Sequence, residues 1–241
     1  MIETLLVDGD IVAYRCAAAT ANDTEAIAVW QTSEMMTRIL HETNAISFKC
    51  FLSGSTNFRY GIYPDYKANR RDMPKPVHLQ AVRSHLVSEW NSSVTDGVEA
   101  DDAMGIEQVQ SNDNSTMIAS IDKDMLMVPG LHYRFVDGTT YRFEDPGELF
   151  AHKKDKILGG GLKWFYAQML MGDTADNIPG LKGIGPKKAL KLLQNIDTEE
   201  EMIYTVKKAY EEHKVLDRFD EVADLLWIQR EEGVKYTDRG L

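Results

Sequence analysis

Carboxylates are the side chains of this sequence whose types and spacing could do chemistry together. They stand in four places along the chain: Asp8 with Asp10, Glu99 with Asp101 and Asp102, Asp122 with Asp124, and Asp173 with Asp176. Hard cations such as Mg²⁺ and Mn²⁺ prefer oxygen ligands, and the set contains no His or Cys. Two such ions about 4 Å apart can activate a water and stabilise the leaving oxygen in phosphodiester cleavage. The acids therefore predict a two-ion site.

Each acidic group also has a plainer interpretation. Asp8-Gly9-Asp10 and Asp122-Lys123-Asp124 are common in polar turns, and Asp101 or Asp102 can cap a helix whose dipole favours negative charge. Four such coincidences at compatible positions are much less common than one. So many carboxylates brought together would also repel one another unless cations neutralised them. We therefore favour the metal site.

A glycine-rich turn follows the last two acids. Asp173 and Asp176 would point to one side if the preceding helix continued for another turn. The turn, PGLKGIGPKK at 179–188, places glycines where backbone approaches a ligand or adopts positive φ. Pro186 suits a first helical position. The N–H groups of that helix end predict a phosphate site, with Lys187, Lys188 and Lys191 nearby. An ordinary Gly-Pro helix connection is the alternative.

A basic segment, Tyr66-Lys67-Ala68-Asn69-Arg70-Arg71, lies before Pro74 and Pro76. Lys67 and Arg70 could bind the scissile phosphate and so contribute electrostatically to catalysis. The Tyr66 ring could stack on a base. A solvated linker is the alternative, and the position of the segment after a strand end favours the substrate role.

The elements that must position these groups alternate between strands and helices. The patterns predict strands at 4–7, 46–52, 116–121, 132–136 and 141–143 and helices at 23–43, 77–90 and 101–109. An apolar stripe at 162–170 predicts an amphipathic helix, and later helices are expected at 186–194, 199–213 and 217–230, so the final third should be all-helical. Alternation implies a mainly parallel α/β sheet, whose ligands bind outside the carboxyl ends of strands. Asp8, Asp122 and Asp124 fall at such ends.

Length and composition suit one large domain with an appendage, or two modest ones, in 241 residues. The net charge of −11 is unusual for a nucleic-acid binder, but thirteen acids against seven bases from Asp197 onward contribute −6 of it. No signal peptide and no run of about twenty apolar residues is found in the sequence, which excludes a membrane span. Two cysteines are too few for a disulfide framework and fit a reducing cytoplasm.

Taken together, the motifs resemble the flap endonuclease family, specifically bacteriophage 5′-3′ exonucleases and the 5′-nuclease domain of bacterial DNA polymerase. They run in the family order over about residues 5–193: VDGD at 7–10, YKANR at 66–70, EADD at 99–102, DKD at 122–124, GDTADN at 172–177 and PGLKGIGPKKA at 179–189. The resemblance implies a PIN-like nuclease core at 1–160 with a short gateway segment at about 57–76. A helical region at 161–241 would follow, with a helix-three-turn-helix at about 172–194 that holds duplex DNA, often with a K⁺ ion.

The resemblance also implies roles for particular residues. Around two divalent ions it groups Asp8, Glu99, Asp101, Asp102, Asp122, Asp124, Asp173 and Asp176. Lys67 and Arg70 match the basic pair at the base of the gateway and join Asp8 and Asp124 as catalytic candidates. Arg15, seven residues after Asp8, matches a phosphate-contacting arginine. The expected DNA contacts are Arg15, Tyr66, Lys67, Arg70, Gly180, Lys182, Gly183, Gly185, Lys187 and Lys188.

Two departures from the family pattern are visible. Family members usually carry another aspartate just after the second strand, where this chain reads Leu52-Ser53-Gly54-Ser55. The segment at 67–77 is short and holds two prolines, so we expect an open gateway rather than a two-helix arch.

The sequence thus predicts a Mg²⁺- or Mn²⁺-dependent 5′ nuclease that acts in replication or repair. Its expected substrates are duplex DNA with a 5′ end, flap or nick, and RNA in RNA-DNA hybrids, and its products carry 5′ phosphates. We expect a monomer in the cytoplasm, that of the host if a phage encodes it. Two alternatives stay open: a structure-selective DNA-binding protein whose catalysis is impaired by the missing acid, and a PIN-type ribonuclease acting on single-stranded RNA.

Overall fold

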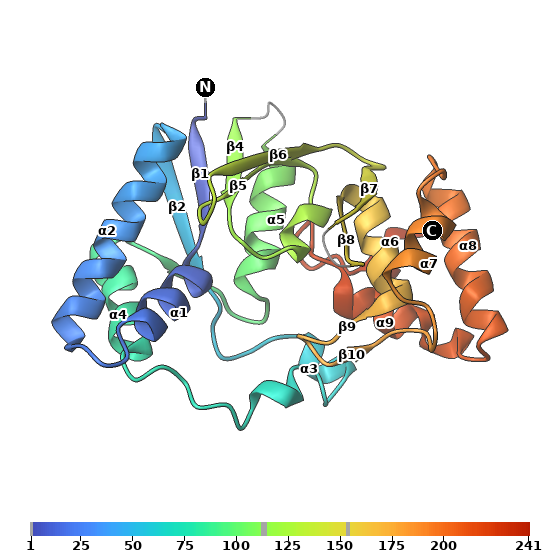
Figure 1. Ribbon diagram of the computed structural model, residues 1–241, viewed down its shortest axis with the longest axis horizontal. Coiled ribbons are helices and arrows are strands. Elements are labelled where there is room, and N and C mark those ends of the chain that lie inside the picture. Colours follow the sequence, from blue (N-terminus) through green and yellow to red (C-terminus); the bar gives the residue numbers. More distant parts are fainter. Residues whose placement is uncertain (1, 112–114, 153–154) are drawn as a thin grey trace. The chain divides into compact units, whose positions relative to one another are not determined.

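The computed structural model describes residues 2–111, 115–152 and 155–241, and the chain divides into two compact units (Figure 1). The first unit comprises Met1–Asn57, Met73–Met125 and Gly130–Arg142. The second comprises Phe58–Asp72, Leu126–Pro129 and Phe143–Leu241. Both units are therefore discontinuous in sequence, and the basic segment belongs with the C-terminal residues.

A six-stranded sheet forms the centre of the first unit, in the order β3-β2-β1-β4-β5-β6. Its strands are β1 (Thr4–Asp8), β2 (Ser47–Leu52), β3 (Ser93–Val94), β4 (Thr116–Ala119), β5 (Gly130–Arg134) and β6 (Thr139–Phe143). The pairs β2–β3, β1–β2, β1–β4 and β4–β5 are parallel. This arrangement confirms the predicted mainly parallel sheet and brings the ends of β1 and β4 side by side.

Four helices cover this sheet: α1 (Gly9–Ala19), α2 (Glu25–Thr43), α4 (Leu79–Glu89) and α5 (Ala100–Gln110). Helices α1, α2 and α4 pack together on one face, whereas α5 contacts β1, β2 and β4 and lies on the other face (Figure 1). Fully buried Val12, Met36 and Leu86 join Leu5 and Val7 in one apolar core. The helices predicted from apolar periodicity are therefore confirmed to within a few residues.

Helix α6 (Gly161–Met171) is the central element of the second unit and contacts α7 (Pro186–Leu193), α8 (Glu199–Glu212) and α9 (Phe219–Leu226). We expected an amphipathic helix here, but every residue from Gly161 to Leu170 is buried, because elements pack around α6 on all sides. The remaining elements are α3 (Arg59–Ile62), β7 (Glu148–Ala151), β8 (Ile157–Gly160), β9 (Gly172–Asp173) and β10 (Ile178–Pro179), with the 3₁₀ turns η1 (Ala68–Arg70), η3 (Leu216–Arg218) and η4 (Tyr236–Arg239).

Three details of the second unit differ from the prediction. The gateway segment at 57–76, for which no helix or strand is predicted, contains α3 and η1. An antiparallel pair, β7–β8, was not predicted, because each strand has only four residues and β8 ends in two glycines. The final third is not all-helical, since β9 and β10 interrupt it and the helix expected at 217–230 narrows to α9. None of the helices within the described residues is long and apolar enough to cross a membrane.

Candidate active site

Asp8 closes β1 and caps the N-terminus of α1. Its Oδ1 accepts a hydrogen bond from the Ile11 N–H at 3.0 Å, and its Oδ2 accepts one from the Ser120 hydroxyl at 2.6 Å. The side chain is only 2% exposed. Burial raises the pKa of Asp8 to about 7; these two hydrogen bonds oppose the rise, and the charges of Asp10 and Asp122 add to it. A divalent cation would stabilise the charged form of this carboxylate.

Asp122 and Asp124 follow β4 on the neighbouring strand. The Ser120 hydroxyl that donates to Asp8 also accepts a hydrogen bond from the Asp122 N–H at 3.0 Å, so one serine links the ends of β1 and β4. Asp122 Oδ1 accepts from the Asp124 N–H at 2.9 Å. Asp124 begins the 3₁₀ turn η2 (Asp124–Met127) and pairs with Lys123 at 2.6 Å. The structure thus brings Asp122 close to Asp8, as the parallel sheet predicts.

The start of α5 carries the third group of acids. Glu99 is the N-cap residue and forms a reciprocal capping box with Asp102, whose Oδ2 accepts from the Glu99 N–H at 3.0 Å. Asp102 is fully buried, and Asp101 is half-buried in the same first turn. The capping interpretation therefore holds for Asp102. The capping box also fixes the orientation of Glu99 and Asp102 at the start of α5.

The donor set of these residues fits Mg²⁺ or Mn²⁺, because it consists of carboxylates alone. Among the described residues, no three His, Cys, Asp or Glu side chains converge in an arrangement that could hold a metal ion as they stand. Asp8, Asp122 and Asp102 instead accept the hydrogen bonds given above. A carboxylate oxygen has two lone pairs, so it can keep such a hydrogen bond while it binds a cation.

Asp173 and Asp176 lie in a tight hairpin rather than on a helix. Helix α6 ends at Met171, Gly172 adopts a φ of 72°, and β9 then pairs antiparallel with β10. The predicted helical continuation is therefore wrong, because the left-handed backbone of Gly172 turns the chain out of the helix. Asp173 is buried, and its Oδ1 accepts from the Ala175 N–H at 2.7 Å.

The basic segment docks on this hairpin. Arg70 donates from Nη2 to Asp176 Oδ1 at 2.7 Å and from Nε to the Ala175 carbonyl at 2.9 Å. The Lys67 N–H donates to the Asp176 carbonyl at 2.9 Å, and Lys67 Nζ lies 3.7 Å from Asp176 Oδ2. Two cations predicted to bind phosphate thus gather around one predicted metal ligand.

Tyr66 does not fit the base-stacking role predicted for it. Its side chain is 1% exposed, and its hydroxyl donates to Asp176 Oδ2 at 3.0 Å. The ring packs edge-on against Tyr60 and lies beneath the Lys67 ammonium. A tyrosine can be buried when its hydroxyl finds a partner, and Asp176 provides one here. In this structure Tyr66 supports the hairpin and is closed to a stacking base.

The glycine-rich turn leads into α7 as predicted, with Gly185 as N-cap and Pro186 in the first turn. A Cβ added at Gly180 would lie 2.1 Å from the Met171 carbonyl carbon, so this glycine is required by packing rather than by ligand approach. Added Cβ atoms at Gly183 and Gly185 would meet nothing within 4 Å. The lysines of the region are all exposed: Lys182, Lys187, Lys188 and Lys191.

Sequence reasoning missed several arginine and histidine contacts. His213, at the end of α8, lies with Nε2 3.1 Å from the Lys182 carbonyl and Nδ1 2.6 Å from the Ala209 carbonyl, beside a pocket of about 190 Å³. Arg59 is buried and donates to two carbonyls at the end of α9. Arg83 pairs with Asp10. Apart from Ala209, their partners are distant in sequence, so no local pattern reveals those contacts.

The predicted phosphate contact Arg15 is exposed on α1, as such a contact would require.

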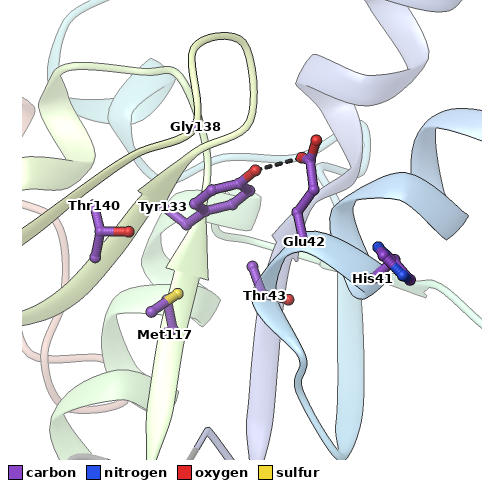
Figure 2. Close-up of a pocket in the computed structure, with 7 residues that line it drawn as sticks. All are labelled: His41, Glu42, Thr43, Met117, Tyr133, Gly138 and Thr140. Carbon is purple, nitrogen blue, oxygen red and sulfur yellow. Dashed lines mark hydrogen bonds between the residues drawn. The ribbon is translucent and has the colours of Figure 1, made fainter.

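A pocket of about 570 Å³ lies between the end of α2, β4 and the β5–β6 hairpin (Figure 2). Within it, the Tyr133 hydroxyl donates to Glu42. Burial and the neighbouring Glu42 charge raise the pKa of Tyr133 to about 12, which keeps this phenol protonated. No predicted site residue lines the pocket, so we do not include it in the candidate site.

The parallel sheet with acids at its strand ends, followed by a helical region, is the arrangement expected of a metal-dependent nuclease, and comparison with known protein families agrees. Residues 3–152 match the family model for the N-terminal resolvase-like domain of 5′-3′ exonucleases, and residues 163–231 match that for their C-terminal SAM fold. The chain belongs to the 5′-3′ exonuclease family.

Its relatives include two kinds of bacterial protein. A flap endonuclease Xni of Shewanella sp. (strain W3-18-1) is 30% identical over 206 residues, which cover 82% of this chain and 76% of that protein. DNA polymerase I of Bacillus subtilis (strain 168) is 26% identical over 254 residues, which cover 97% of this chain but 28% of the polymerase. The chain thus spans little more than a quarter of that relative.

Solved structures show the same fold. A bacteriophage T5 flap endonuclease, in a pseudo-enzyme-product complex with DNA and metal ions, matches with a TM-score of 0.67 at 16% identity, covering 93% of this chain and 89% of that one. The T5 protein co-crystallized with metal ions matches with a TM-score of 0.66 at the same identity. The PIN-like sheet followed by a helical SAM-like region is therefore confirmed as the fold.

Proposed function

We propose that this protein is a divalent-metal-dependent 5′ nuclease that hydrolyses DNA phosphodiesters at or near a 5′ end, flap or nick. The observation that carries the proposal is the pairing of Lys67 and Arg70 with Asp176, because it gathers cations suited to a phosphate around an acid suited to a metal ion. Membership of the 5′-3′ exonuclease family supports it, as does the solved T5 complex with DNA and metal ions.

The proposed ligands of two Mg²⁺ or Mn²⁺ ions are Asp8, Glu99, Asp101, Asp102, Asp122, Asp124, Asp173 and Asp176. When bound, the ions supply water activation and neutralise charge on the phosphate. Lys67 and Arg70 hold the scissile phosphate after exchanging Asp176 for it. The Lys123 ammonium, 2.6 Å from Asp124 Oδ1, holds that carboxylate at the start of η2. Tyr66 orients Asp176 through its hydroxyl.

The proposed duplex anchor is the helix-three-turn-helix at about 172–194. The N-terminus of α7 and the exposed lysines bind phosphates without reading bases, and Gly183 and Gly185 let the DNA backbone approach. Arg15 adds a phosphate contact from α1. The carbonyls of the turn are suitable ligands for a K⁺ ion. In this proposal residues 1–160 form the nuclease core, the helical region at 161–241 holds the duplex, and RNA-DNA hybrids are a second substrate.

The setting of this activity is part of the same proposal. A nuclease that yields 5′-phosphorylated ends serves DNA replication or repair, and it would work as a monomer in the cytoplasm, that of the host for a phage protein. The DNA-binding alternative is supported by the absence of an acid at Leu52–Ser55, where the family usually has one.

Incubation with a 5′-flap duplex labelled at its 3′ end tests the proposal. We expect cleavage in Mg²⁺ and none in EDTA, with products that ligase can join because they carry 5′ phosphates. Asp124→Asn and Asp173→Asn should abolish cleavage but spare flap binding. Binding without cleavage by the wild type would favour the DNA-binding alternative, and preference for single-stranded RNA would favour the ribonuclease.

A further inference from the structure

Three residues from separate elements of the first unit form a bracket beside the acids. Arg83 on α4 pairs through Nη1 with Asp10 Oδ1 on α1 and donates from Nη2 to the Ser53 carbonyl at 2.6 Å. The Ser53 N–H donates to Asp10 Oδ2 at 2.8 Å. We call this set the Asp10–Ser53–Arg83 bracket.

Both carboxylate oxygens of Asp10 are used inside the bracket. Oδ1 faces the guanidinium and Oδ2 faces a peptide N–H. Asp8 also uses both oxygens, for a helix N–H and a hydroxyl, so Asp10 differs from it in being paired with a charged guanidinium. The geometry suits Asp10 to fixing backbone rather than to binding a metal ion. The +1 charge of Arg83 pairs with the −1 charge of Asp10, and the Asp10 charge still adds to the raised pKa of the neighbouring Asp8.

The bracket extends to the start of α5. The Ser53 hydroxyl accepts a hydrogen bond from the Ala100 N–H at 2.9 Å. Ala100 is the first residue of α5 and follows Glu99, the N-cap residue whose capping box includes Asp102. Ser53 thus touches Asp10, two residues after Asp8, and Ala100, next to Glu99. One residue at the end of β2 links the two helix ends that carry these acids.

We propose that Arg83 is a positioning residue for metal binding. Through Asp10 and Ser53, it sets the spacing between Asp8 and the Glu99–Asp102 capping box. The inference rests on the proposed function in one respect, that these acids bind the divalent ions. Arginine is required because its planar fork contacts a carboxylate and a carbonyl at once, which a lysine ammonium cannot do with the same geometry. Groups that orient metal ligands without touching the ion commonly change metal affinity 10- to 100-fold.

Isothermal titration of the DNA-free full chain with Mn²⁺ tests the bracket. Arg83→Gln and Asp10→Asn should each weaken Mn²⁺ binding about tenfold, with flap binding in EDTA unchanged. The double variant should be no weaker than the weaker single variant, because both substitutions break one linkage. Lys49→Gln is the matched control: it removes a cation from an ion pair of the same unit, with Glu107, and should leave Mn²⁺ affinity unchanged.

Arg83→Lys keeps the charge and should weaken Mn²⁺ binding by an intermediate factor. If Arg83→Gln does not fold, the Arg83→Lys variant provides the test instead. Wild-type Mn²⁺ affinity in a folded Arg83→Lys protein would overturn the proposal. Multiplying losses in the double variant, or a wild type that binds no Mn²⁺, would also overturn it. A wild type that binds Mn²⁺ but cuts no flap defeats the proposed function alone, since the Mn²⁺ affinities still test the bracket.

Discussion

Arg70 and Asp176 are paired at 2.7 Å, although we assign one to the substrate phosphate and the other to the metal site. Their side chains are 48% and 19% exposed. An ion pair this open to water contributes at most about 1 kcal/mol. A phosphate group carrying its own negative charge can therefore replace Asp176 as the partner of Arg70 at little cost. The pairing holds the arginine in place without blocking its use.

Asp176→Asn should separate binding from cutting. Loss of the negative charge frees Lys67 and Arg70 for phosphate, so flap affinity in EDTA should rise about threefold, while cleavage in Mg²⁺ is lost. Fluorescence anisotropy of a labelled flap gives the affinity. Asp137→Asn, an equal charge change at an exposed ion pair of the first unit, should alter neither quantity. Equal tightening in both variants would mean that only net charge matters.

Replacing Lys187 and Lys188 by alanine should weaken DNA binding regardless of sequence. Removal of two phosphate contacts reduces the slope of log affinity against log salt by roughly one to two. The ion pair of Lys187 with Asp155 is exposed and should not compete strongly with DNA. Titrations at several salt concentrations measure the slope. The double variant Lys207→Ala with Lys208→Ala, on α8, is the control. An unchanged slope in the Lys187 and Lys188 variant would contradict the proposal that α7 anchors the duplex.

Arg59→Met should destabilise the second unit. Arg59 is 2% exposed and donates from Nε to the Leu225 carbonyl at 2.9 Å and from Nη2 to the Trp227 carbonyl at 2.7 Å. Its loss leaves buried acceptors unpaired, which costs about 3 kcal/mol. Urea unfolding followed by circular dichroism measures the change. Arg71→Met, at an exposed position of the same segment, should cost less than about 0.5 kcal/mol.

Cys50 should stay unreactive in the folded protein. Burial raises the pKa of Cys50 from 9.0 to about 12, and burial also raises the pKa of Cys16. An aromatic disulfide reagent at pH 8 should label neither thiol until guanidinium unfolds the chain. Because the folded form binds the Cys50 proton more tightly, the free energy of unfolding should fall as pH rises from about 9 towards 12. Cys50→Ala should flatten that fall, and rapid native labelling of the wild type would contradict the burial.

The sequence predicts the first unit better than the second, and the reason is physical. Asp8 and Asp122 could be placed near each other because parallel strands bring their carboxyl ends to one edge, so strand recognition was sufficient. Pro186 marked the start of α7 because proline suits that position. Both inferences depend on local patterns, namely the apolar strand before each acid and the residues next to Pro186.

Contacts between distant residues could not be predicted in this way. Asp176 meets Tyr66 across 110 positions, and Arg59 meets Trp227 across 168. A tyrosine next to basic residues suggests base stacking until a buried partner is known. The spacing of Asp173 and Asp176 suggested one helix face, and only the left-handed φ of Gly172 shows that the helix has ended.

The closeness of Gly172 and Gly180 restricts how this protein can change during evolution. A Cβ added at Gly172 would lie 2.2 Å from the Gly180 nitrogen, and one added at Gly180 would meet Met171. Neither position has room for any other amino acid, and an inserted residue would move two backbone segments apart. We expect random libraries to recover only glycine at both positions, while neighbouring Gly183 accepts a small set of replacements such as Asn. Variation in substrate preference would then have to arise in the lysines and loops around this hairpin, not in its length.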